Sequence, residues 1–377
     1  MHADSTTEIV DTVVIGAGQA GLATGYYLAR QGREFTILDG AERIGDSWRS
    51  RWDSLRLFTP AKYNRLPGTR FPARRWSFPT KDEMADYLES YAARFDLPVE
   101  TGVKVERVSR RGDRFIVSAG DRRIEAANLV VASGAHRIAR VPGFALDLDP
   151  RIVQLHSSDY RSPSQLRNGG TLVVGAGNSG AEIAKELVAT QATWLSGRNV
   201  GEIPVPHGGM RARIVLPIIR FLGHHVLTVR TPIGRKVGPM VASGATPLIR
   251  TKSADLEAAG VERLPRVAGV REGLPELEDG RVLDVANVVW CTGFHDDYSW
   301  LELPAFGDDG RPAHDRGVVA SQPGLYFVGL VFQYSATSDV LPGVGRDAKR
   351  IAGQIARRSL APRRAAAPLD AADAQAA

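Results

Sequence analysis

Two short glycine-rich segments carry the residue pattern most suited to chemistry in this 377-residue chain. The first has glycines spaced G-x-G-x-x-G and directly follows the apolar run Thr12–Ile15. In such a segment the first glycine permits a tight turn, the second lets a pyrophosphate approach the backbone, and the third lets the next helix pack on the strand. The N-terminus of that helix then faces the phosphates. The spacing predicts a dinucleotide site formed by Gly16, Gly18, Gln19, Ala20 and Gly21.

The same arrangement occurs again after the apolar run Thr171–Val174, but the strands that follow the two turns end differently. The first strand ends on Asp39, whose carboxylate suits ribose hydroxyls and repels a 2′-phosphate. The second ends in Ser196-Gly197-Arg198, where a hydroxyl and a guanidinium suit a 2′-phosphate, although a solvated loop arginine is the alternative for Arg198. We therefore expect bound FAD at the first turn and exchanging NADPH at the second. The predicted NADPH contacts are Gly175, Gly177, Asn178, Ser179, Gly180, Ser196 and Arg198.

Two further extended runs, at 129–134 and 288–293, end in small-residue turns and predict strands that return beside the two sites. The chain is accordingly predicted to be α/β, with two Rossmann-like dinucleotide-binding domains and the NADPH domain inserted into the FAD domain. We expect the FAD domain to comprise residues 8–150 and 293–362, the NADPH domain residues 151–292, and a disordered tail residues 363–377.

The composition, with 43% hydrophobic and 24% charged residues and a net charge of +6, is typical of a globular protein. The basic residues form no stripe interleaved with aromatic residues, so we expect no nucleic-acid partner. Cys291 is the only cysteine, which excludes a redox-active cysteine pair and a cysteine-based zinc site, and no histidine spacing indicates a metal. The apolar stretch 214–229 contains Pro217 and Arg220 and is too polar to span a bilayer. We expect a cytoplasmic protein without an integral membrane segment; peripheral membrane contact through 214–229 and a homo-oligomer both stay open.

Other segments share their residue patterns with one enzyme family. These segments are Gly45–Trp48, Arg51–Pro60, Phe78–Lys81, Ser133–Gly134, Thr292–Gly293, Gly324–Leu330 and Gly343–Ala348. Together with the glycine turns they make the whole chain, apart from its tail, resemble the flavin-containing monooxygenases, particularly the bacterial and plant-like single-component group. The family pattern F-x-G-x-x-x-H-x-x-x-Y is present only in its second half, from His156 to Tyr160, because Pro150 and Ile152 stand where Phe and Gly would be. The departure concerns the strict subfamily and leaves the broader family intact.

The resemblance implies an FAD-dependent, NADPH-consuming monooxygenase that uses a C4a-(hydro)peroxyflavin. One oxygen atom of O2 would enter a small organic substrate by N-, S- or Baeyer–Villiger/oxo-acid chemistry. The resemblance assigns no acid, base or nucleophile, and the flavin-side candidates for catalysis are Trp48, Gln333 and Asn178. Further contacts implied for FAD are Trp48, Val105, Ser133, Gly134, Gly329 and Gln333, and for NADPH Thr292 and Gly293.

Other functions stay compatible with two dinucleotide sites. An NADPH:acceptor flavin reductase would pass electrons to a protein partner or quinone, and a non-catalytic NADPH-sensing protein would perform no turnover. A thioredoxin-reductase-like enzyme needs a dithiol, whereas Cys291 is alone. The intact flavin-side segments favour an enzyme over the sensor.

Overall fold

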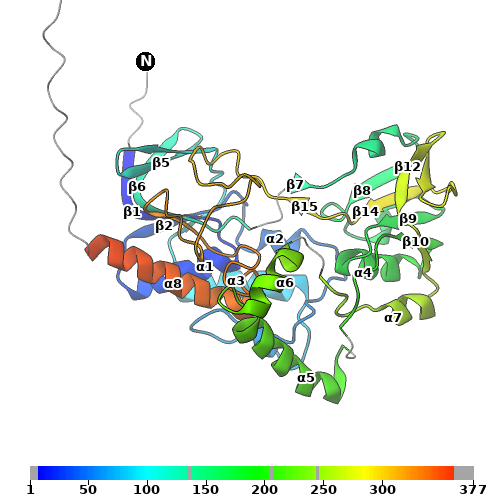
Figure 1. Ribbon diagram of the computed structural model, residues 1–377, viewed down its shortest axis with the longest axis horizontal. Helices are drawn as coiled ribbons and strands as arrows, with labels where there is room; N and C mark the ends of the chain where they lie inside the picture. The colour runs from blue at the N-terminus through cyan, green and yellow to red at the C-terminus, as the bar shows by residue number, and fades with distance from the viewer. Residues whose placement is uncertain (1–6, 135–137, 204–206, 243–245, 361–377) are drawn as a thin grey trace, which may run out of the picture.

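The computed structural model describes residues 7–134, 138–203, 207–242 and 246–360, which form two lobes along the long axis of the molecule (Figure 1). The first lobe holds a seven-stranded sheet in the order β3-β2-β1-β6-β5-β4, with β16 paired to the second half of β6. Around β1 the strands run parallel, and β4, β5 and β6 form an antiparallel meander. The strands are β1 (Thr7–Ile15), β2 (Phe35–Leu38), β3 (Val99–Glu100), β4 (Arg107–Arg111), β5 (Arg114–Ala119), β6 (Arg122–Val131) and β16 (Leu325–Phe327).

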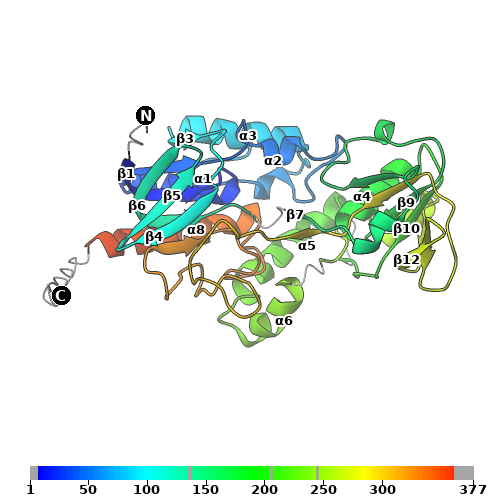
Figure 2. The same cartoon turned by 90° about the horizontal axis from the view of Figure 1, so that it is seen from above.

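Each face of this sheet has its own core, because alternate residues of a strand point to opposite faces. Val14 and Val130 face a core shared with the helices, and Val13 and Val131 face a core that includes Phe327. The helices of the first lobe are α1 (Gln19–Arg30), α2 (Asp46–Arg49), the 3₁₀ turn η1 (Ala61–Tyr63), α3 (Lys81–Arg94) and α8 (Leu341–Leu360). Figure 2 shows α8 and the β4–β5–β6 meander from above.

A capping box fixes the start of α3, within the segment 78–81 noted in the sequence. The Thr80 hydroxyl accepts a hydrogen bond from the Glu83 backbone N–H at 3.1 Å, and the Glu83 carboxylate accepts one from the Thr80 N–H at 2.8 Å. This reciprocal pair satisfies two N–H groups that the helix itself leaves without partners. Further along α3, Ala85 is closely approached by Gly45 of the α2 segment, which has φ of +92°.

The second lobe holds a five-stranded, entirely parallel sheet in the order β11-β10-β9-β14-β8. One face packs on α4 and α7, and the other on the β12–β13 hairpin and the turn η2. The elements of this lobe are η2 (Gly143–Asp147), β8 (Val153–His156), η3 (Pro163–Gln165), β9 (Thr171–Val174), α4 (Asn178–Leu187), β10 (Thr193–Ser196), α7 (Ser253–Ala258), β11 (Glu262–Leu264), β12 (Val267–Arg271), β13 (Leu274–Leu277) and β14 (Asn287–Trp290). The α/β fold class with an inserted second Rossmann-like domain is thus confirmed.

Two short antiparallel strands, β7 (Ile138–Ala139) and β15 (Phe294–His295), carry the chain between the lobes (Figure 1). The expected boundary at residue 150 differs from the packing, because Ala145 and Leu148 lie in the core of the second lobe. We therefore propose that the first crossing lies at β7, while the second crossing at β15 stays close to the expected residue 293. The expected tail lies outside the described residues.

A helical arm, residues 207–242, leaves the second lobe and lies under the first (Figure 1). It consists of α5 (Gly209–Phe221), a π-helical turn η4 (Leu222–Val226) and α6 (Pro232–Ala242). The arm contacts the C-terminal part of the first lobe through a bridge between Thr228 and Ser335. No described helix is both long enough and apolar enough to cross a membrane.

Candidate nucleotide-binding sites

The first glycine turn joins β1 to α1 and tolerates no side chain at two of its glycines. Gly16 has φ of +106°, and a Cβ there would lie 2.6 Å from the carbonyl oxygen of Ala132; a Cβ on Gly21 would lie 1.8 Å from the Gly16 oxygen. The Gly16 N–H donates to the Leu38 carbonyl at 2.7 Å, which joins the turn to the end of β2. A Cβ on Gly18 would meet no described atom within 4 Å, so this glycine leaves the approach to the helix N-terminus open.

The second turn repeats this geometry between β9 and α4. Gly175 has φ of +113°, and a Cβ there would lie 2.2 Å from the Cys291 carbonyl oxygen. A Cβ on Gly180 would lie 1.8 Å from the Gly175 oxygen, and one on Gly177 would again meet nothing within 4 Å. The turns match in spacing, backbone conformation and open approach, so the residues present fit a dinucleotide pyrophosphate at both places.

Asp39 lies at the end of β2 beside the first turn, where the sequence placed it. Its carboxylate accepts hydrogen bonds from the backbone N–H groups of Ala17, at 2.5 Å, and Ala41, at 2.8 Å. Two carboxylate oxygens offer about four acceptor positions, so ribose hydroxyls can still be bound. The Val103 N–H donates to the Asp39 carbonyl at 2.9 Å, which brings the half-buried Val105 to the same edge.

The ends of β6 and β16 complete the rim of the first site. The Ala132 N–H donates to Ile15 at 2.8 Å, so Ser133 and Gly134 follow directly beside the glycine turn. Gly329 has φ of +90°, and a Cβ there would come within 2.9 Å of the Ala20 side chain at the start of α1. The three predicted positions 133, 134 and 329 are therefore brought together with the glycine turn.

Three other predicted FAD residues have more specific positions. The Gln19 amide donates to the backbone carbonyl of Asp339 at 2.6 Å, which ties the start of α1 to the segment before α8. Gln333 is 1% exposed; its amide nitrogen donates to the Phe327 carbonyl at 2.9 Å, and its amide oxygen accepts from a loop N–H. Its polar atoms therefore support their own loop, and we propose a positioning role instead of contact with the flavin. Trp48 packs, partly buried, against the first core.

The end of β10 carries two predicted NADPH residues, Ser196 and Arg198, in different surroundings. Ser196 is fully buried; its hydroxyl donates to the Pro265 carbonyl at 2.7 Å and accepts from the Val267 N–H at 3.1 Å. Both hydrogen-bonding roles of the hydroxyl therefore hold β10 to the segment after β11, and the expected contact of Ser196 with NADPH stays a prediction. Gly197 turns the chain with φ of +149°, and the next side chain, Arg198, is exposed without a hydrogen-bond or ion-pair partner among the described residues.

The remaining NADPH candidates differ in whether their side chains are already hydrogen-bonded within the protein. The Asn178 amide donates to Pro247 at 3.0 Å and accepts from the Ile249 N–H at 2.9 Å, so it anchors the segment that follows the arm. The Thr292 hydroxyl donates to the backbone of Arg140 in the crossing segment. Ser179 lies in the first turn of α4, half-buried. Through these hydrogen bonds, Asn178 and Thr292 hold neighbouring segments in place around the second site.

His156 ends β8, and Tyr160 lies in the core of the second lobe beside α4. Burial lowers the pKa of His156, whose Nε2 lies 3.1 Å from the Gly293 carbonyl oxygen. The Tyr160 hydroxyl is fully buried and donates to Glu186 at 2.8 Å, and burial raises its pKa. His156 therefore contacts the crossing segment at Gly293, whereas Tyr160 joins the segment after β8 to α4.

Sequence reasoning missed two groups in the loop before α8. Burial raises the pKa of the Asp339 carboxyl to about 6, and this residue lies next to the start of α1 through its contact with Gln19. The ring of Tyr334 lies between the guanidiniums of Arg316 and Arg346, each 4.2 Å from the ring centroid. No motif in the sequence indicates either group, because the positions of both depend on the path of the chain before α8.

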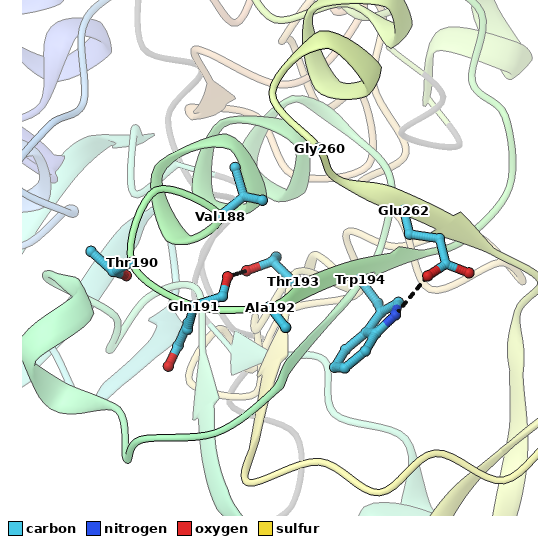
Figure 3. A pocket seen from close by; sticks show the side chains of 8 residues that line it. All are labelled: Val188, Thr190, Gln191, Ala192, Thr193, Trp194, Gly260 and Glu262. Carbon is cyan, nitrogen blue, oxygen red and sulfur yellow. Dashed lines mark hydrogen bonds between the residues drawn. The ribbon is translucent and has the colours of Figure 1, made fainter.

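An open hollow in the second lobe lies at the wrong edge for a cofactor. It is lined by residues at the starts of β10 and β11, including Thr193, Trp194 and Glu262, and the Trp194 indole N–H donates to Glu262 at 2.9 Å (Figure 3). In a parallel sheet of this kind ligands bind at the carboxyl ends of the strands. The described residues also contain no cluster of three or more His, Cys, Asp or Glu side chains that could hold a metal ion.

Comparison with known proteins agrees with this geometry. The family model described as pyridine nucleotide-disulphide oxidoreductase matches residues 13–199. An uncharacterized CzcO-like oxidoreductase of Geobacillus kaustophilus is 39% identical over 350 residues, covering 92% of this chain and 98% of that protein. The probable indole-3-pyruvate monooxygenase YUCCA3 of Arabidopsis thaliana is 30% identical, covering 92% of this chain and 86% of the plant protein.

Among solved structures, a flavin-containing monooxygenase from Stenotrophomonas maltophilia matches with a TM-score of 0.76 and 28% identity. The match covers 94% of this chain and all of that one. The relatives therefore span nearly the full length of both lobes, including both glycine turns. The chain belongs to the flavin-containing monooxygenase family, and it is an oxidoreductase that uses FAD and NADPH.

Proposed function

We propose that the Asp39 turn binds FAD, that the Arg198 turn binds NADPH, and that the protein transfers one oxygen atom from O2 to a small organic substrate. The observation that carries the assignment is the opposite charge at two otherwise matching turns. A carboxylate beside the first turn accepts from ribose hydroxyls and repels a 2′-phosphate, whereas an exposed guanidinium beside the second attracts it.

The bound flavin supplies the redox chemistry by accepting a hydride from NADPH and by reacting with O2. The balanced reaction consumes the substrate, O2, NADPH and a proton, and yields the oxygenated substrate, NADP⁺ and water. The chain's own residues bind and orient the two cofactors. Gly18 and Gly177 leave room for the pyrophosphates, and Gln333 fixes the loop that joins β16 to α8.

The arm supports an oxygenase because it covers the loop before α8. The Val229 N–H donates to the Tyr334 carbonyl at 2.9 Å, and a Cβ on Gly238 would lie 3.0 Å from the ring of Phe332. We infer that the arm, by covering this loop, excludes water from the flavin. Exclusion of water protects a reactive oxygen species from loss as hydrogen peroxide. A dithiol mechanism has no second thiol, and burial raises the pKa of the Cys291 thiol to about 12.

The test measures oxygen transfer directly. The purified, flavin-loaded protein is incubated with NADPH, ¹⁸O2 and separate thioether, amine, ketone and 2-oxo acid substrates, and products are analysed by mass spectrometry together with hydrogen peroxide. We expect at least one class to gain a single ¹⁸O atom while peroxide formation falls. If one hydrogen peroxide forms for each NADPH oxidised with every substrate class, and a quinone or protein acceptor speeds NADPH oxidation, the chain is a reductase and the proposal is wrong.

A further inference from the structure

The arm exposes a row of large apolar side chains on α5. Met210, Ile214, Ile218 and Phe221 are 69%, 63%, 53% and 58% exposed. Their spacing of four, four and three residues places them on one face of the helix, and we call this set the apolar stripe. The opposite face of α5 carries Ala212, which is 3% exposed. The stripe therefore contributes nothing to the described core, although its side chains are those that normally form one.

The other side of the arm is fixed to the first lobe. Arg213 and Arg220 lie over the rings of Trp76 and Tyr63, at 5.7 and 5.3 Å from the ring centroids. On α6, Gly238 packs so closely on the loop before α8 that a Cβ would lie 3.0 Å from the ring of Phe332. The arm is thus attached along its inner side, and the stripe keeps its outward position.

The charge of the arm has a single sign. From Ile203 to Ala254 the sequence contains no Asp or Glu. The arm itself carries six basic residues, and in addition to the two stacked arginines these are Arg211, Arg230, Arg235 and Lys236, all exposed. Elsewhere the chain mixes both signs, with 48 basic and 42 acidic residues in total. An exposed apolar helix face, on an arm whose charged residues are all cations, is the pattern of a helix that lies in the interface of an anionic membrane.

We propose that the arm docks on the surface of an anionic lipid bilayer, with the apolar stripe in the headgroup region and the flanking basic residues on the lipid phosphates. A second copy of the chain fits the stripe less well. Two-fold packing would bring the basic residues of one arm against the same residues of the other, with no carboxylate in either arm to pair with them. The proposal concerns the location of the protein and holds whatever the enzyme oxidises.

The test uses the full-length, flavin-loaded protein in vesicle flotation. Vesicles contain either phosphatidylcholine alone or equal parts of phosphatidylcholine and phosphatidylglycerol. The double variant Ile218→Ser, Phe221→Ser removes part of the stripe, and Arg211→Ala with Lys236→Ala removes two cations. Leu146→Ser is the matched control, because Leu146 is 91% exposed but lies in η2, outside the arm. Bound flavin and the thermal unfolding midpoint establish that each variant is folded.

We expect wild type and Leu146→Ser to float with the anionic vesicles only, and to be released at high salt. The charge variant should lose roughly fivefold in partition coefficient for each cation removed. The stripe variant should lose roughly tenfold or more. Wild-type protein that never floats with anionic vesicles would overturn the proposal. A concentration-dependent dimer in analytical ultracentrifugation that the stripe variant dissociates would also overturn it, by assigning the stripe to a second copy.

Discussion

Replacing Arg198 with alanine tests the assignment of the second site most sharply. The side chain is exposed and has no partner among the described residues, so its removal breaks no internal contact. A hydrogen bond to a charged group contributes about 1.5 to 3 kcal/mol, and exposure to water brings this toward the lower limit. About 1.4 kcal/mol corresponds to a factor of ten. We therefore expect KM for NADPH to rise roughly tenfold, with kcat nearly unchanged, because the 2′-phosphate lies far from the reacting ring.

The assay measures KM and kcat for NADPH and for NADH, which differ only in that phosphate. KM for NADH should stay within about twofold of wild type, as estimated from ordinary surface substitutions. Arg281→Ala is the matched control, since Arg281 is an exposed arginine of the same lobe that pairs with Asp279 at 2.8 Å. Equal losses with both nucleotides, or an equal effect of Arg281→Ala, would refute the role of Arg198.

The other predictions concern the two turns, one buried serine and one histidine. Gly18→Val should abolish bound flavin, seen as lost absorbance at the flavin band, whereas Gly177→Val should keep flavin and raise KM for NADPH; the reverse pattern would exchange the two cofactors. Ser196→Ala should lower the free energy of unfolding by about 1–3 kcal/mol in urea titration while the ratio of KM values for NADH and NADPH stays constant; a changed ratio would restore the serine to the site. Burial and the nearby guanidinium of Arg346 lower the pKa of His224 to about 4. The imidazole of His224 therefore binds a proton more readily in the unfolded chain than in the folded one, and stability falls as pH drops from 6.5 toward 4. His224→Gln should remove about 1–2 kcal/mol of this fall, and an unchanged pH slope would show that His224 does not cause it.

The geometry of the two glycine turns could be predicted from the sequence because it depends on local backbone conformation. Gly16 and Gly175 both adopt positive φ next to a neighbouring strand, and the spacing of the motif encodes that close approach. Asp39 was predictable for the same reason, since it ends the strand that follows the first turn. Local patterns of this kind predict the conformation of a turn without knowledge of the rest of the chain.

Long-range contacts explain what the sequence could not supply. The hydroxyl of Ser196 turns inward because Pro265 and Val267, distant in sequence, satisfy it. The amide of Asn178 is held by the segment 247–249, and nothing near it in the sequence indicates this. The boundary expected at residue 150 followed from strand spacing alone, whereas our proposed boundary at β7 depends on the packing of η2 in the second lobe.

The most direct test of an oxygen-transferring enzyme is rapid mixing of the flavin-loaded protein. The protein is first reduced without oxygen by NADPH or by NADH, and is then mixed with oxygenated buffer while flavin absorbance and hydrogen peroxide are followed. We predict faster reduction by NADPH, then a flavin spectrum that matches neither the oxidised nor the reduced form and lasts longer when NADP⁺ is bound. Direct reoxidation in one step, with one hydrogen peroxide formed for each flavin, would contradict the proposed function.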